Sequence, residues 1–282
     1  GAGVSEEEKK RFSGQVLEEE MIILPDPPQD AHKYSRGAVQ IIGGAEPYGG
    51  APLLASLGAL KAGAGYVVTD VLQKDSRLVP ADFIVRGHEG FEDVKLHDKC
   101  QVHLIGPGMG RSEGAEEFLK QLFEEKKGRK LVLDADALFF FDRVYRKGIH
   151  EVIVTPHLGE FSRMTGRSVA EIRSGVIPLG QAFAREKSCV LVLKSHGTVI
   201  FYPDGEFSVN PWGNPYLATM GSGDILSGVV AALWARGFTR EHAAAAGVLI
   251  HSRAGDRLVE EGDVNFTAAD IAAAIPKIVK RG

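Results

Sequence analysis

Short apolar runs alternate with stretches of helical spacing along most of the chain, and this alternation constrains the fold more than any other feature. Runs of this kind, rich in β-branched residues, are typical of strands buried on both faces. Two intervening stretches, 51–63 and 114–128, have helical spacing, and each ends at a glycine suited to the position after a helix. We therefore expect an α/β fold, a three-layer αβα sandwich with a mostly parallel central sheet. The expected strands are 39–42, 66–71, 102–105, 131–133, 152–154, 190–193 and 198–202.

The composition favours a globular protein that acts on small molecules. The chain has 282 residues, 44% of them hydrophobic, and its net charge of −4 gives no electrostatic footprint for nucleic acid or an anionic membrane. It has no apolar run of about 18 residues that would span a bilayer, and its acidic N-terminus is unlike a signal peptide. We expect one cytoplasmic domain over residues 1–282, with an N-terminal helix and a Pro-rich linker within residues 1–30. Cys100 and Cys189 lie beside expected strands, which predicts buried, inert thiols.

Small, polar or charged segments follow five of the expected strands, at 43–50, 106–110, 134–136, 155–160 and 194–198. In open α/β sheets, ligands bind outside the carboxyl ends of the strands, so these segments are predicted to line one crevice. Neither glycine segment matches a known phosphate motif: GPGMG lacks the final glycine of a dinucleotide fingerprint, and GGAEPYGG lacks the Gly-Lys-Ser/Thr of a P-loop. A plain strand-to-helix turn remains open for both.

The segment GSGD precedes a run with apolar residues at 225, 226, 229, 230 and 233, which predicts a helix. Gly221, Ser222 and Gly223 would leave the N–H groups at the helix start unobstructed, as an anion hole requires. Asp224 would lie in the first turn, where the helix dipole keeps it ionised and able to accept a proton from a substrate hydroxyl. A carboxylate that merely stabilises the helix start is the alternative.

Two acidic segments allow more than one interpretation. Asp134 and Asp136 in LDADAL suit either metal binding or the start of a helix. In TPHLGE, His157 and Glu160 lie three residues apart at a predicted helix start, where both side chains could belong to a functional site. A capping box using Thr155, or a turn at Pro156, accounts for the same residues.

The segment KSHGT combines Lys194 with a tight turn at Gly197, which suits contact with phosphate. A hairpin between two strands explains it equally well. The other histidines, including His251, are interpreted as structural or surface residues.

In this order, the segments resemble the ribokinase-like superfamily and, more closely, the ADP/ATP-dependent NAD(P)H-hydrate dehydratase family. The similarity covers nearly the whole chain. It rests on AHKYSRGAVQIIGGAEPYGGAPLLASLGALKAGAGYV, IGPGMG, LVLDADAL, VTPHLGEFSRMTG, VLKSHGT and GNPYLATMGSGDILSGVVAAL.

The resemblance implies a role for each matching residue. Asp224 would be the catalytic base, and Gly221, Ser222 and Gly223 would form the anion hole. Residues implied to bind ATP or ADP are Lys194, Ser195, His196, Gly197, Thr198, Asn214 and Gly223. Residues implied to bind the hydrated dinucleotide are Ala51, Gly108, His157 and Asp224. Glu160 matches an acid linked to Mg²⁺, in a pattern where His157 replaces the usual Asn.

The implied reaction returns hydrated NADH or NADPH to NAD(P)H, a metabolite repair. Phosphorylation of the 6-hydroxyl by ATP or ADP would be followed by elimination of phosphate. The resemblance also suggests a homo-oligomer, with a tetramer as the working prediction, and no epimerase domain of the kind that bifunctional members carry. The alternatives are a kinase for a vitamin-precursor or sugar hydroxyl, and a nucleotide-binding sensor without turnover.

Three residues depart from the family's usual glycines: Tyr34, Tyr216 and Met220. All three are expected near the site, where larger side chains would narrow a pocket. We expect the Met220 thioether to pack over the phosphate path and exclude water.

Overall fold

The computed structural model describes residues 14–24, 29–73 and 82–281. Its main strands are β1 (Gln15–Val16), β3 (Ala38–Gly43), β4 (Tyr66–Val71), β5 (Ile84–Gly87), β6 (Val102–Ile105), β7 (Lys130–Leu133), β8 (Glu151–Val154), β9 (Val190–Leu193), β10 (Val199–Phe201) and β11 (Phe207–Val209). They form a ten-stranded sheet in the order β1-β11-β10-β9-β8-β7-β6-β3-β4-β5. Neighbouring strands are parallel except at β9–β10 and β10–β11. The expected mostly parallel sheet is confirmed.

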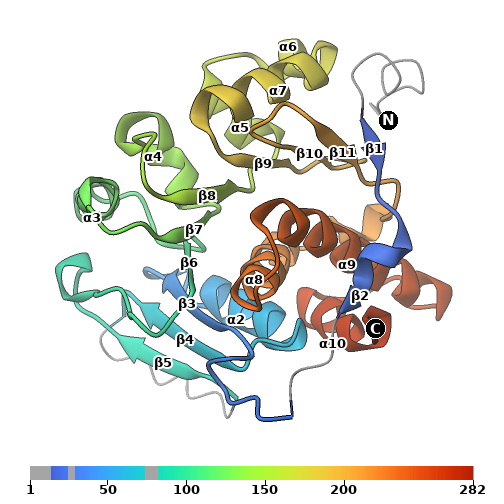
Figure 1. Cartoon of the computed structure of the whole chain (residues 1–282), viewed down its shortest axis with the longest axis horizontal. Helices are drawn as coiled ribbons and strands as arrows, with labels where there is room; N and C mark the ends of the chain where they lie inside the picture. The colour runs from blue at the N-terminus through green and yellow to red at the C-terminus, as the bar shows by residue number, and fades with distance from the viewer. Residues whose placement is uncertain (1–13, 25–28, 74–81, 282) are drawn as a thin grey trace.

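Helices cover both faces of this sheet. They are α2 (Gly50–Lys61), α3 (Glu113–Glu124), α4 (Asp136–Val144), α5 (Leu158–Thr165), α6 (Val169–Ser174), α7 (Val176–Lys187), α8 (Ser222–Ala235), α9 (Arg240–Glu260) and α10 (Ala268–Ile278). Figure 1 shows α3 to α7 along one face and α2, α8, α9 and α10 on the other, with the sheet curving around α8. Each face has its own hydrophobic core. The three-layer αβα sandwich is therefore confirmed.

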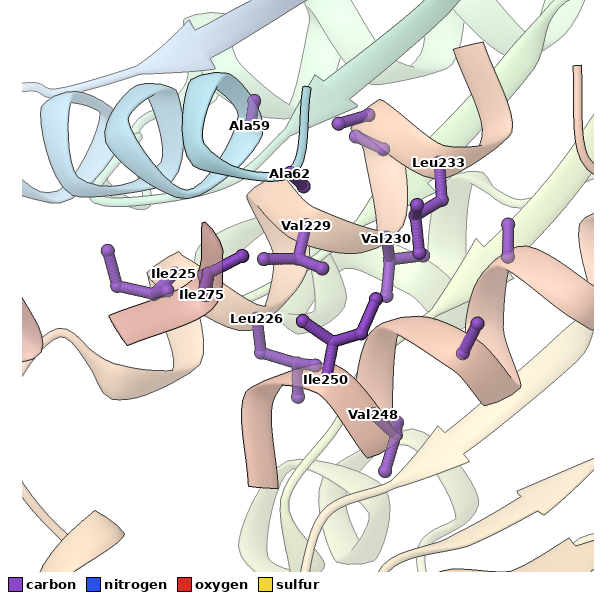
Figure 2. Packing of buried hydrophobic residues seen from close by; sticks show 14 of the residues in the cluster. Ala59, Ala62, Ile225, Leu226, Val229, Val230, Leu233, Val248, Ile250 and Ile275 are labelled. Carbon is purple, nitrogen blue, oxygen red and sulfur yellow. The ribbon is translucent and has the colours of Figure 1, made fainter. Parts of the chain in front are cut away.

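The helix α8 is buried along nearly its whole length. All five side chains expected to face the core are buried, namely Ile225, Leu226, Val229, Val230 and Leu233. Figure 2 shows them among labelled residues of the neighbouring helices: Ala59 and Ala62, Val248 and Ile250, and Ile275. Where α2 crosses α8, a Cβ on Gly58 or Gly228 would collide with the facing backbone, so the two helices pack backbone to backbone.

The N-terminal helix expected within residues 1–30 is wrong for the part that the structure describes. Residues 14–24 form β1, a 3-10 turn η1 (Glu19–Ile22) and β2 (Ile23–Leu24). The strand β1 pairs with β11, and β2 pairs with β12 (Lys280–Arg281). Leu17, Ile22 and Leu24 are buried in the core, so tertiary packing overrides the helix propensity of the glutamates. Residues 1–13 and most of the Pro-rich break, 25–28, lie outside the described residues.

Two other expectations concern the glycines that follow α2 and α3 and the burial of the two cysteines. Gly63, at φ +94°, follows α2 as expected, but α3 ends at Glu124, so Gly128 is not its C-terminal glycine. Cys100 and Cys189 are buried as predicted, and burial raises the pKa of each thiol to about 12. Among residues 14–24, 29–73 and 82–281, no helix is long and apolar enough to cross a bilayer.

Candidate active site

The carboxyl ends of five neighbouring parallel strands meet at one edge of the sheet, because β9, β8, β7, β6 and β3 are adjacent in its order. The loops that follow β3 and β6 are joined there: Gly44 N–H donates to the Pro107 carbonyl at 3.0 Å, and Ala45 N–H to the Gly108 carbonyl at 2.7 Å. A Cβ on Gly108, at φ +58°, would lie 3.3 Å from the Cβ of Ala51. The structure therefore brings the predicted substrate residues Ala51 and Gly108 side by side.

The α8 helix begins at Ser222 without a side-chain cap. Gly221 adopts φ +85° as the N-cap, a left-handed conformation in which a side chain would also collide with Leu54. The Ser222 N–H donates to the Thr219 carbonyl at 3.2 Å. This corrects the expected anion hole, because in the described structure the N–H groups left without a protein acceptor are those of Gly221, Gly223 and Asp224.

Asp224 lies in the first turn of α8 as expected. Burial, followed by the nearby charges of Asp134 and Glu160, raises the pKa of its carboxyl to about 7 against the opposing charge of Lys194. Burial therefore opposes the ionised state that the position of Asp224 at the helix start favours. A carboxyl with this pKa is suited to exchange a proton near neutral pH.

A buried ion pair lies beside the start of α8. The Lys194 Nζ is 2.9 Å from Oδ1 of Asp134, which is 1% exposed. The same ammonium lies 3.3 Å from where a Cβ on Gly223 would be. Burial lowers the pKa of Lys194, but the charges of Asp134, Glu160 and Asp224 raise it above its usual value. The open helix start thus has a fixed positive charge next to it.

Asp134 and Asp136 have different partners, although they are one residue apart. Asp136 begins α4 and accepts hydrogen bonds from the Gly110 N–H at 3.1 Å and the Arg111 Nε at 2.9 Å. The two carboxylates do not converge on a shared metal position. The helix-start interpretation holds for Asp136, and Asp134 instead positions Lys194.

The helix α5 begins with a complete capping box. His157 Nδ1 accepts from the N–H groups of Gly159 at 3.0 Å and Glu160 at 3.3 Å, and Glu160 Oε2 accepts from the His157 N–H at 2.8 Å. The capping alternative for TPHLGE is therefore correct, with His157 and not Thr155 as the cap. Burial raises the pKa of Glu160, and burial lowers that of His157.

No group of three or more His, Cys, Asp or Glu residues among the described ranges is arranged to hold a metal ion. Mg²⁺ commonly takes only one or two protein carboxylates and completes its shell with waters and substrate phosphates. This donor set fits an ion that arrives with a nucleotide, with Glu160 as the candidate carboxylate, because its Oε1 is not used by the capping box.

A cavity of about 800 Å³ opens at this edge of the sheet. Its wall includes most of the predicted nucleotide residues, together with Ser222 and His157: Lys194, Ser195, His196, Gly197, Asn214 and Gly223. The KSHGT segment is also the turn between the antiparallel strands β9 and β10, so the hairpin interpretation is confirmed and contact with phosphate stays a prediction. Thr198 is not in the wall, and its carbonyl accepts from the Asn210 N–H at 2.9 Å.

Asn214 lines the cavity with its side chain already engaged. Its Nδ2 donates to Asp256 at 2.9 Å, and its Oδ1 accepts from the Tyr216 N–H at 3.1 Å, which caps η3 (Pro215–Leu217). Asn214 therefore shapes the wall by tying its own loop to the Asp256 side chain on α9.

The structural interpretation of His251 is confirmed, but the sequence did not predict its place in the cavity wall. It is 7% exposed, lines the cavity, and its Nε2 is 3.0 Å from Ser222 Oγ at the start of α8. Burial lowers the pKa of His251 to about 4, so its ring is neutral. The pattern of α9 contained a clue, because Ala244, Val248 and Ala254 place His251 on a buried apolar stripe where a polar ring needs a partner.

Tyr34, Tyr216 and Met220, which replace the family's usual glycines, do not narrow one shared pocket. Tyr34 packs on Tyr66 with ring centroids 4.9 Å apart, at the amino edge of the sheet, so the expectation that it lies near the site is wrong. Tyr216 faces Phe266 and is not in the cavity wall. Met220 is 94% exposed, so its thioether does not pack over the phosphate path within this chain.

Comparisons with known proteins agree with this arrangement. Residues 39–277 match the family model described as NAD(P)H-hydrate dehydratase. The chain is 34% identical over 278 residues to the bifunctional NAD(P)H-hydrate repair enzyme of Moorella thermoacetica, covering 91% of this chain and 52% of that protein. It is 30% identical over 264 residues to the ADP-dependent (S)-NAD(P)H-hydrate dehydratase of Bacillus subtilis, covering 92% and 94%. The chain thus spans about half the length of the bifunctional relatives that it matches.

The fold also matches solved structures. That of the Bacillus subtilis ADP/ATP-dependent NAD(P)H-hydrate dehydratase, co-crystallised with ATP and Mg²⁺, gives a TM-score of 0.82 at 28% identity, over 95% of this chain and 98% of that chain. Together with likeness to a protein described as ribokinase-like, this confirms the expected ribokinase-like fold.

Proposed function

The chain belongs to the NAD(P)H-hydrate dehydratase family, and we propose that it uses ADP or ATP to return hydrated NADH or NADPH to NAD(P)H. One observation carries the proposal most strongly. An uncapped helix start, with Lys194 beside it, faces a cavity of nucleotide size, and Asp224 lies in its first turn with a pKa of about 7.

The first step is phosphoryl transfer to the hydrate. Asp224 takes the proton of the 6-hydroxyl while the hydroxyl oxygen attacks the terminal phosphoryl group of the nucleotide. The free N–H groups at the start of α8 and the Lys194 ammonium stabilise the charge that develops on the transferred phosphoryl group. The nucleotide leaves as AMP from ADP, or as ADP from ATP.

The second step restores the ring. Hydroxide leaves a saturated carbon poorly, but phosphate leaves readily when the lone pair of the ring nitrogen assists. Loss of a proton from the neighbouring carbon then completes the double bond of the dihydronicotinamide. The net reaction consumes one phosphoanhydride bond for each molecule repaired and releases inorganic phosphate.

The other residues take positions around this chemistry. Lys194 to Thr198, Asn214 and Gly223 are proposed to hold the nucleotide, and Ala51, Gly108 and His157 the hydrate. Mg²⁺ bound with the nucleotide would neutralise phosphate charge, and Glu160 would supply its protein carboxylate. A single domain and a tetrameric homo-oligomer remain predictions, and analytical ultracentrifugation measures the latter.

The test mixes the protein with acid-hydrated NADH, Mg²⁺ and either ADP or ATP. We expect the dihydronicotinamide absorbance to return, with phosphate released in equal amount. A stable phosphorylated product without NADH would instead identify a small-molecule kinase. No phosphate release with either nucleotide would leave only a nucleotide-binding protein.

A further inference from the structure

A tryptophan forms part of the cavity wall. Trp212 lines the same cavity as Lys194 and Gly223, and it remains 36% exposed. The guanidinium carbon of Arg253 lies 4.4 Å from the centre of the ring. Arg253 itself is not among the residues that line the cavity.

The segment that carries Trp212 is fastened to α9 on both sides of the indole. Before it, the buried Asn210 donates through Nδ2 to Ser252 Oγ at 2.8 Å and to the Trp212 carbonyl at 2.9 Å. After it, the Gly213 N–H donates to Asp256 at 2.9 Å. The position of the indole is therefore fixed before a ligand arrives, and binding against it costs little ordering entropy.

Arg253 is held in place as well. Its guanidinium pairs with Glu19 at 3.0 Å, Glu260 at 3.4 Å and Asp256 at 3.7 Å. These carboxylates keep the guanidinium over the ring from one side. The part of Trp212 that remains exposed is left for a ligand.

We propose that Trp212 is the stacking platform for the purine base of the nucleotide, an inference that rests on the proposed function. The same cavity has the positive charge and open helix start for phosphates at Lys194 and Gly223, and apolar walls at Val209, Pro211 and Leu217. An aromatic face among apolar side chains favours a flat π-system over a polar group. A two-ring purine covers more of an indole than a one-ring pyrimidine does, so the platform also favours ADP over UDP.

The chain contains two tryptophans, which makes the inference directly measurable. Trp234 is 1% exposed within the core, so its emission serves as an internal reference. Titration of the full chain with ADP is expected to quench Trp212. The variant Trp234→Phe should keep the quench, and Trp212→Phe should lose it while binding ADP within about threefold of wild type, because a phenyl ring still stacks.

Calorimetry with Trp212→Leu separates stacking from folding. We expect ADP to bind roughly 5- to 100-fold more weakly, the usual range for loss of one base stack, while inorganic pyrophosphate binds as in wild type. The preference for ADP over UDP should shrink in parallel.

Unchanged ADP affinity in Trp212→Leu would overturn the platform and leave the proposed function intact. Equal weakening of ADP and pyrophosphate would also overturn it, since Trp212 would then act by supporting Arg253 and the loop. Failure of the wild-type chain to bind ADP or ATP would overturn the proposed function and the platform together.

Discussion

Two helices begin beside Lys194 with an acid at the same position, the third residue, yet the two starts are built differently. At α5, the His157 side chain caps the backbone and Glu160 reaches back to the His157 N–H. At α8, the N-cap is Gly221, which has no side chain, and the Asp224 carboxyl makes no such return bond. The side chains at the start of α5 bond its own backbone N–H groups. The start of α8 leaves N–H groups and a carboxyl available for a ligand.

The closed form recurs at two other helices of the described residues, whereas α2, α4 and α7 also begin without a side-chain cap. Helix α6 closes with Ser168 and Glu171, and α10 closes with Thr267 and Asp270. Glycine in place of a capping side chain costs roughly a few tenths of a kcal/mol, which α8 offsets by burying nearly its whole length. The difference teaches that an absent cap marks a ligand site only together with other features, which at α8 are the Lys194 ammonium beside Gly223 and the cavity lined by Ser222 and Gly223.

The largest expected effect separates the two kinds of acid. Asp224→Asn should lower turnover of hydrated NADH by roughly 10²- to 10⁴-fold, the usual contribution of a general base, while ADP binding persists. Glu171→Gln alters an acid at the same helix position in a closed box away from the cavity, and should leave turnover within about twofold. Steady-state kinetics on both variants decides the matter, and near-normal turnover in Asp224→Asn would remove its role.

The pH dependence of activity follows from the raised pKa of Asp224. The ionised carboxylate is the active form, so kcat/KM should fall about tenfold per pH unit below pH 7 and level off above it. Since the Asp134 charge helps to raise this pKa after burial, Asp134→Asn should move the midpoint to lower pH. A profile flat between pH 5 and 8 would contradict the assignment.

Stability should change in opposite directions at the two kinds of start. The folded-state pKa of Asp224 lies above its usual value of 3.8, so ionisation disfavours folding, and the cost grows between about pH 4 and 7. Asp224→Asn should therefore be more stable than wild type at pH 8, by on the order of 2 kcal/mol, but not at pH 4. The pKa of Glu171 is lowered by its Ser168 hydrogen bonds, so Glu171→Gln should lose stability above pH 5. Urea denaturation at both pH values measures each difference.

The smallest expected effect is at Met220. Because this side chain is almost fully exposed, Met220→Gly should leave ADP affinity and nucleotide hydrolysis without hydrate unchanged. Phosphate release is the measurement. A rise in hydrolysis without hydrate would restore the shielding role that the sequence suggested.

Local pattern was enough to predict the sheet and the position of Asp224. Strands such as 66–71 and 102–105 match because buried parallel strands are mostly apolar and rich in β-branched residues, even though Asp70 and His103 interrupt these two. The edge strand β5 was missed because Arg86 interrupts its apolar run, and that arginine makes sense only through its pair with the buried Asp70 on β4. The three-residue β11 is too short for periodicity to reveal.

The details of the site depended on contacts between residues far apart in the chain. The Lys194–Asp134 pair spans 60 residues and the His251–Ser222 pair spans 29, and no spacing rule predicts either. The pKa of Asp224 likewise depends on how deeply tertiary packing buries it. The hydrogen bond from the Ser222 N–H to the Thr219 carbonyl depends on the turn that the glycines allow.

The central claim is that the open start of α8 holds the phosphoryl group that is transferred. A crystal structure of the protein with ADP and Mg²⁺ tests it most directly. We predict the terminal phosphate within hydrogen-bond distance of the N–H groups of Gly221 and Gly223, with the nucleoside against residues 194–198. Phosphate density at the GPGMG loop, residues 106–110, with nothing at the start of α8, would contradict it.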